Sequence, residues 1–71
     1  MPQVSSRELV RFLPSRGFAE DRQSGGHLVL RHANGTSVTV PMHGGADLGR
    51  GLAVRLLKDA AFTVEEYLRL R

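Results

Sequence analysis

Gly25, Gly26 and His27 place a bare stretch of backbone directly before an imidazole side chain. Paired glycines weaken a strand and leave nothing to pack, but they let another backbone come close because no side chain stands in the way. Histidine transfers protons near neutral pH, since its unperturbed pKa is about 6.5. The stretch therefore predicts a surface that a phosphate backbone can approach, with a proton-transfer group beside it.

Composition limits what kind of site this can be. A chain of 71 residues is expected to form one domain, and so small a domain favours a shallow surface site. The absence of cysteine excludes disulfides and thiolate metal sites. Without an apolar leader or a stretch long enough to span a bilayer, we expect a cytoplasmic protein with no membrane partner. A net charge of +3 indicates an anionic partner, of which nucleic acid is the commonest, although the charge could serve solubility alone.

The first element that must position this site is a helix over residues 6–16. Ser5 and Glu8 have the spacing of a capping box, apolar residues follow at helical spacing, and Gly17 suits the position after a helix end. Pro14 removes a hydrogen bond from a helix interior. We therefore expect a distorted last turn or an early end.

Three antiparallel strands follow, the first of them polar and weak, which is typical of a sheet edge. They are predicted at residues 18–23, 27–32 and 36–41. A glycine-rich loop over residues 42–51 leads to a second helix whose apolar face carries Leu52, Leu56, Leu57 and Ala60. A second capping box, Thr63 and Glu66, opens a short last helix.

The register of the central hairpin decides which side chains share a face. A three-residue loop with Gly35 in the left-handed conformation pairs Leu30 with Val38 and Leu28 with Val40. Directly opposed residues lie on one face, so this register builds a single apolar surface, whereas a two-residue loop would split it. The main helices are expected to cover that surface in a two-layer α+β domain.

The same parity places His27, Val29 and Arg31 on the face turned away from the helices. A histidine beside an arginine on an open face is not a core histidine. The bare backbone of the two glycines and the flanking guanidinium together favour a phosphate-binding role for this face.

In this order and spacing, the sequence resembles the HicA toxins of bacterial type II toxin–antitoxin pairs, also described as YcfA-like mRNA interferases. The resemblance covers nearly the whole chain. Its landmarks are S-x-x-E-L-V-R-x-L near the start, R-G-F at 16–18, R-Q-S-G-G-H at 22–27, R-H-A-N-G-T-S-V-T-V-P at 31–41, H-G-G-A-D-L at 43–48, L-L-K-D-A at 56–60 and T-V-E-E-Y at 63–67.

The resemblance implies a single domain over residues 1–71 with the α-β-β-β-α fold of a double-stranded-RNA-binding domain. It also implies a metal-independent endoribonuclease that needs no cofactor, cleaves mRNA as single-stranded RNA and is neutralised by a HicB-type antitoxin. The family's essential histidine falls on His27.

Histidine suits such a reaction because RNA carries its own nucleophile, the 2′-hydroxyl. The enzyme has to move two protons and stabilise the charge that develops on the phosphate. Backbone N–H groups of Gly25 and Gly26 are candidates for cradling that phosphate. The basic side chains predicted to contact RNA are Arg22, Arg31, Arg50, Arg55 and Lys58.

Other interpretations stay open. His43 could be an accessory acid or RNA contact, but we favour a hydrogen bond that stabilises its loop, and His32 is expected to be structural or solvated. A metal site built from His27, His43 and Asp47 lacks the tight spacing of such sites. The chain could also be a non-catalytic RNA-binding module, a decayed toxin that only binds RNA or antitoxin, or a plain protein-interaction domain.

Overall fold

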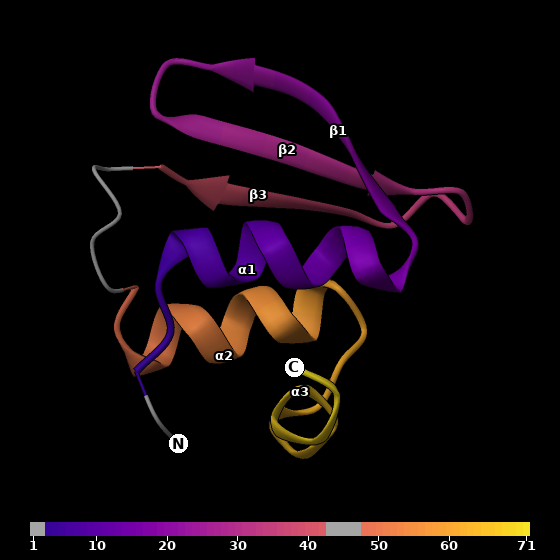
Figure 1. Ribbon diagram of the computed structural model, residues 1–71. Helices are drawn as coiled ribbons and strands as arrows, with labels where there is room; N and C mark the ends of the chain where they lie inside the picture. Colours follow the sequence, from indigo (N-terminus) through magenta and orange to yellow (C-terminus); the bar gives the residue numbers. More distant parts are fainter. Residues whose placement is uncertain (1–2, 43–47) are drawn as a thin grey trace.

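The computed structural model describes residues 3–42 and 48–71 and shows helices packed against an antiparallel sheet (Figure 1). The elements in chain order are α1 (Ser6–Phe12), the 3₁₀ helix η1 (Leu13–Arg16), β1 (Phe18–Ser24), β2 (His27–His32), β3 (Ser37–Pro41), α2 (Arg50–Asp59) and α3 (Val64–Leu70). The three strands lie in the order β1-β2-β3. This confirms the predicted α+β class with its helix, three antiparallel strands and following helices.

The first helix changes character where Pro14 was expected to disturb it. Ser5 caps α1 by accepting a hydrogen bond from the N–H of Glu8 at 3.2 Å. The α-helix ends at Phe12, and a tighter 3₁₀ turn carries the chain to Arg16, with Pro14 in its first turn. Proline has no N–H to donate to the preceding turn, so the α pattern cannot continue through it. Gly17, at φ +94°, ends the segment in the left-handed conformation.

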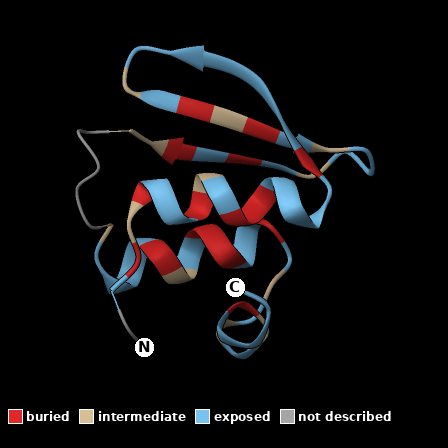
Figure 2. Ribbon diagram, in the orientation of Figure 1, coloured by how far each residue is buried: buried red, intermediate tan, exposed pale blue. Residues whose placement is uncertain are grey.

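The central hairpin has the predicted three-residue loop. Leu30 pairs with Val38 and Leu28 with Val40, and Gly35 has a φ of +96°. The alternation is visible as buried bands along β2 and β3 in Figure 2. One face of the sheet is therefore apolar and buried, as the register argument required.

β1 lies at the sheet edge, as predicted, and contains a bulge that the sequence analysis did not foresee. Glu20 pairs with Leu30, but Arg22 pairs with Val29, so Asp21 is an extra residue with no partner across the ladder. An extra residue reverses the parity of everything that follows it in the strand. Phe18 therefore faces the core, while Arg22 lies on the open face with Val29.

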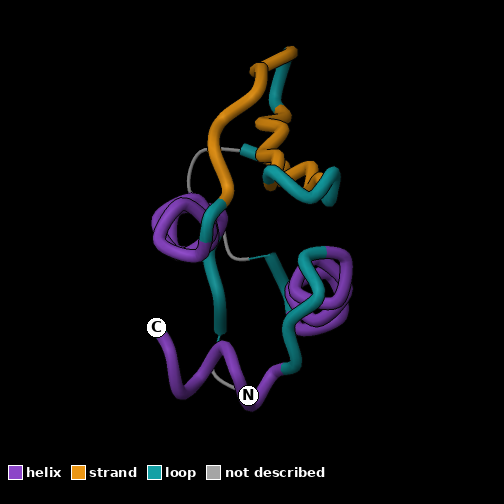
Figure 3. Tube along the Cα trace, turned by 90° about the vertical axis from the view of Figure 1, so that its right-hand side faces the viewer, coloured by secondary structure: helices purple, strands orange, loops and turns teal. Residues whose placement is uncertain are grey.

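α2 begins at Arg50, two residues before the predicted start, because the glycine-rich loop supplies a first turn. Gly49 has a φ of +77° and its carbonyl accepts a hydrogen bond from the N–H of Ala53 at 3.0 Å. Seen from the side, α1 and α2 lie next to each other beneath the sheet (Figure 3). Both contact β3, so the core forms between the sheet and this pair of helices. The fully or almost fully buried apolar residues include Leu9, Leu13, Leu30, Val38, Val40 and Leu57.

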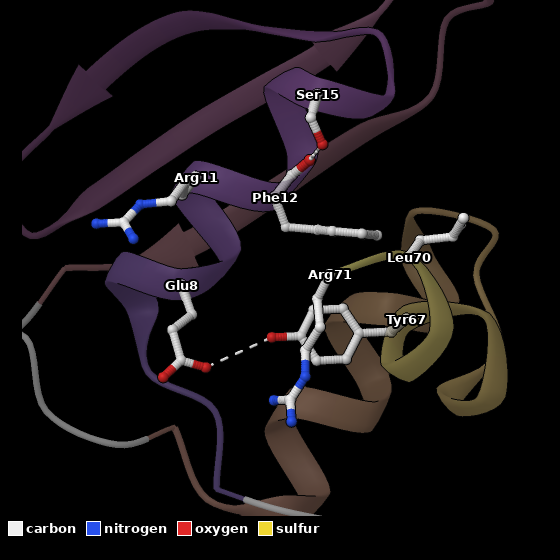
Figure 4. A pocket seen from close by; sticks show the side chains of 7 residues that line it. All are labelled: Glu8, Arg11, Phe12, Ser15, Tyr67, Leu70 and Arg71. Carbon is white, nitrogen blue, oxygen red and sulfur yellow. Dashed lines mark hydrogen bonds between the residues drawn. The ribbon is translucent and has the colours of Figure 1, made fainter.

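α3 closes the far side of the core through Tyr67, whose side chain is 1% exposed. Its ring packs edge-on against Phe12 with 4.9 Å between ring centroids. The phenol O–H donates to the Glu8 carboxylate at 3.5 Å (Figure 4), and the Arg71 guanidinium lies 5.7 Å from the ring centroid. Burial raises the pKa of the Tyr67 phenol. Both capping boxes proposed from the sequence mark helix starts, and the Thr63–Glu66 box is complete.

Candidate functional site

His27 is exposed on the face of β2 opposite the buried leucines. As the first residue of β2 it pairs with Ser24 of β1 and with Pro41 of β3. The predicted parity is therefore confirmed: the imidazole lies on the solvent side, where a polymer could reach it.

The backbone around His27 is held from the β3 side. The Met42 N–H donates to the Gly26 carbonyl, which continues the β2–β3 ladder past the end of both strands. The hydroxyl of Ser6, a residue only 2% exposed, donates to the Pro41 carbonyl at 2.6 Å. A site at the end of a hairpin is thus tied to the first turn of α1, which restricts the movement of the strand that carries the histidine. Sequence reasoning gave Ser6 no role.

The two glycines before His27 have different surroundings. Gly25 has a φ of +58°, a conformation that favours glycine, and a Cβ at this position would meet no atom within 4 Å. Open space therefore lies above the turn, with room for a ligand. At Gly26 the close backbone approach predicted from the sequence is made by Met42 of the chain itself. This engages the Gly26 carbonyl and leaves the N–H groups of the turn as the candidates for binding a phosphate.

The open face of the sheet carries two of the predicted arginines. The Asp21 bulge brings Arg22 to the face of His27, and Arg31 lies two pairs further along β2. Arg31 forms an ion pair with Asp21, with 3.6 Å between the guanidinium nitrogen and the carboxylate oxygen. Both side chains are well exposed, and such surface pairs contribute little to stability. Asp21 therefore offsets part of the positive charge of Arg31 without removing that charge from solvent.

A hollow of about 620 Å³ joins this face to α2, and the sequence analysis did not predict it. It is lined by His27, Ser37, Thr39 and Pro41 of the sheet and by Leu52, Arg55, Leu56 and Asp59 of α2. Its volume lies within the range of ligand pockets, although it is open to solvent. Arg55 is thereby placed in the same hollow as His27. The α2 residues follow the i, i+3, i+4, i+7 spacing of one helix face, the signal that could have grouped them.

The other two basic candidates on α2 do not line the hollow. At 100° per residue, Arg50 lies about 170° and Lys58 about 110° around the helix from the middle of the lining face. Both side chains are exposed. His43 and Asp47 lie outside the described residues, so the predictions for them stay predictions.

A second hollow lies between α1 and α3 and holds none of the predicted site residues. Its lining consists of Glu8, Arg11, Phe12, Ser15, Tyr67, Leu70 and Arg71. In Figure 4, Glu8, Phe12 and Arg71 lie around the Tyr67 ring. Glu8 and Tyr67 are already joined there by their hydrogen bond. This hollow is therefore separate from the His27 face.

Within residues 3–42 and 48–71, no three histidine or acidic side chains are grouped so that they could hold a metal ion. No helix of the described part of the chain has the length and apolar character that crossing a membrane requires.

Comparison with protein families places this chain in a known one. The family model described as "HicA toxin of bacterial toxin-antitoxin" matches residues 6–61, a span that runs from α1 through α2 and includes the whole sheet. No curated protein matches the chain. The match covers well over half of the sequence and contains the His27 turn, the bulged strand and the α2 side of the hollow. The chain therefore belongs to the family of HicA toxins of bacterial toxin–antitoxin systems.

Proposed function

We propose that this toxin is a metal-independent endoribonuclease that cleaves mRNA through His27 and is neutralised by a HicB-type antitoxin. The observation that carries the proposal is the placement of His27, exposed and lining one hollow with Arg55. The imidazole can transfer protons, and the permanently charged Arg55 guanidinium can bind a phosphate. Together at one open site they suit a phosphodiester of a flexible single strand.

The proposed chemistry uses the 2′-hydroxyl of the RNA as nucleophile. Its oxygen attacks the neighbouring phosphorus, the bond from phosphorus to the 5′-oxygen breaks, and the products are a 2′,3′-cyclic phosphate and a free 5′-hydroxyl. His27 acts as general acid–base group by accepting the 2′ proton or donating a proton to the leaving oxygen. A positioned group of this kind accelerates a reaction by about 10²–10⁴-fold. That suffices for a toxin, since one cut inactivates a whole message.

The phosphate contacts are proposed from the same placement. Open space lies at Gly25 beside His27, the N–H groups of Gly25 and Gly26 are the proposed donors to the phosphate, and Arg55 lines the hollow from α2. Arg22 shares the open face and extends the cationic surface toward β1. Arg31 is the weaker candidate of the sheet, because the Asp21 carboxylate competes with phosphate for its guanidinium.

Removal of the His27 side chain tests the proposal. His27→Ala should abolish growth arrest in a bacterial host and cleavage of a labelled transcript by purified protein. Its circular dichroism spectrum should match that of the wild type, because the side chain is exposed. The matched histidine control is His32→Ala, which removes the other histidine of β2 and should still cleave at temperatures where it is folded. Wild-type cleavage should survive EDTA and leave 2′,3′-cyclic phosphate ends.

Three results would contradict the proposal. A His27→Ala protein as active as the wild type would exclude the assigned catalytic group. Wild-type protein that binds the transcript with strong salt dependence but leaves it intact would instead identify an RNA-binding module or a decayed toxin. No RNA affinity even at low salt would point to a plain protein-interaction domain.

A further inference from the structure

The hollow between β3 and α2 is elongated, and His27 lies at one end of it. β3 and α2 run in opposite directions, so the Pro41 end of β3 neighbours the start of α2 (Figure 1). From Ser37 to Pro41 the strand extends about 13 Å, and from Leu52 to Asp59 the helix rises about 10 Å. His27, which pairs with Pro41, therefore lies well away from Asp59 at the far end.

The negative charge of Asp59 at this far end is unfavourable for α2. It is the last residue of α2, where the helix macrodipole disfavours a negative charge. Arg55 is one turn earlier on the same face, yet the one ion pair between described residues joins Arg31 and Asp21. None of the side-chain hydrogen bonds among the described residues uses the Asp59 carboxylate. The carboxylate is exposed, lines the hollow and has its acceptor sites available.

We propose that Asp59 is a specificity-determining residue that binds the Watson–Crick edge of a guanine in the bound strand. This inference rests on the proposed function, because it takes single-stranded nucleic acid as the occupant of the hollow. A carboxylate offers two acceptor oxygens, and guanine alone among the four RNA bases presents two adjacent donors, N1–H and the N2 amino group, on that edge. The match is bidentate and charge-assisted. Unstacked bases of single strands are read through these edges.

The remaining lining of the hollow fits the parts of a nucleotide strand. A phosphate cannot lie against Asp59, because the two negative charges repel, but Arg55 offers it a cation one helical turn away. Pro41 and Leu52 contribute apolar groups near the His27 end, and Leu56 contributes them further along α2, which suits a sugar or a base face. The cut beside His27 and the base read at Asp59 therefore belong to different nucleotides of one strand.

The test uses single-stranded 2′-deoxy oligonucleotides, which lack the nucleophile and cannot be cut by the proposed route. One probe is an oligoadenylate with a single central guanine, and the second carries inosine, which lacks the N2 amino group, at the same place. The wild type should bind the guanine probe at least about fivefold more tightly than the inosine probe. Asp59→Asn, which removes a charge that the helix end disfavours and should fold normally, should bring that ratio close to one. Glu65→Gln is the matched control: it removes an exposed carboxylate on α3, outside the hollow, and should keep the wild-type ratio.

The outcomes separate this inference from the proposed function. Equal binding of both probes by the wild type, an unchanged preference in Asp59→Asn, or no binding of either probe would overturn the role of Asp59. Guanine preference that depends on Asp59 in a protein that leaves RNA transcripts intact would support the inference and refute the nuclease. Where the wild type cleaves, mapped cut sites should show a guanine at a fixed offset in the wild type, and this enrichment should be lost in Asp59→Asn.

Discussion

His27 and His32 are the first and last residues of β2, but their surroundings differ. The Nδ1 of His32 accepts a hydrogen bond from the N–H of Asn34 at 3.1 Å, and its ring packs edge-on against Phe18 with 5.2 Å between centroids. These contacts hold the ring between the hairpin loop and the start of β1, which is the structural one of the two roles, structural or solvated, expected from the sequence. His27 is exposed at the opposite end of β2 and lines a hollow. Of these two histidines, His27 is the more exposed one.

The His32 ring leaves no room for a side chain at Gly17. A Cβ at position 17 would lie 2.7 Å from the Nε2 of His32, and the φ of +94° already disfavours any other residue. Gly17→Ala should therefore lower the free energy of unfolding by about 1–3 kcal/mol from backbone strain, with a further loss from the clash. Urea unfolding monitored by circular dichroism measures the change.

Gly35→Ala is the control for that experiment, because Gly35 has nearly the same φ, +96°, but open space around the position of a Cβ. It should show the backbone cost alone. The difference between the two variants then measures the steric contribution of His32. Equal losses in both would show that the imidazole moves aside and that the contact with Gly17 contributes nothing.

At the scale of elements, β1 shows which parts of the site local sequence can predict. The register of the β2–β3 hairpin followed from Gly35 and the alternating leucines and valines, and with it the exposure of His27. The face of Arg22 did not follow, because it depends on the bulge at Asp21. A bulge in a polar edge strand has no apolar alternation to reveal it. The bulge brings Arg22 to the face that carries His27.

The capping box of α3 makes the stability of this element depend on pH. The backbone N–H of Thr63 donates to the Glu66 carboxylate at 2.8 Å. This hydrogen bond is the main cause of a lowered pKa of Glu66, and a hydrogen bond with the Thr63 side chain is the second cause. A lowered folded-state pKa means that the contribution is complete above the unfolded carboxyl pKa of about 4.3. It is lost as the pH falls through the lower folded-state pKa.

Glu66→Gln should remove this pH dependence and keep the box, because a glutamine side chain accepts the same hydrogen bond without titrating. Between pH 7 and pH 3, the urea midpoint of the wild type should fall by more than that of the variant. Glu65→Gln, one residue away and outside the box, should follow the wild type. Identical falls in all three proteins would show that the box does not contribute to acid sensitivity.

At the scale of the whole molecule, the site depends on how α2 packs, which the sequence pattern left undetermined. The apolar face of α2 correctly predicted that Leu56 and Leu57 are buried, and the expected two-layer fold was confirmed. The pattern could not show that α2 lies along β3 in such a way that Arg55 and Asp59 line one hollow with the outward-facing Ser37 and Thr39. Tertiary packing fixes that placement, since the same amphipathic helix could cover the sheet further from its β3 edge. The exposure of His27 was therefore predictable from the sequence, whereas the α2 residues that line the hollow with it were not.

Under the proposed function, the net charge of +3 acts through individual contacts between cationic side chains and phosphates, and the salt dependence of binding measures how many such contacts form. For single strands, log K falls with log salt by about 0.7 for each phosphate neutralised. With an uncut 2′-deoxy oligonucleotide, Arg55→Gln and Arg22→Gln should each reduce that slope by about 0.7, because both guanidinium groups lie on the proposed path of the strand. Arg50→Gln is the matched control: it removes the same charge from the side of α2 opposite the hollow, so it should weaken binding little and leave the slope unchanged. Fluorescence anisotropy titrations between 50 and roughly 200 mM salt measure the slopes of the wild type and the three variants. An equal reduction of the slope in all three variants would mean that binding depends on total charge and that the hollow does not bind the strand.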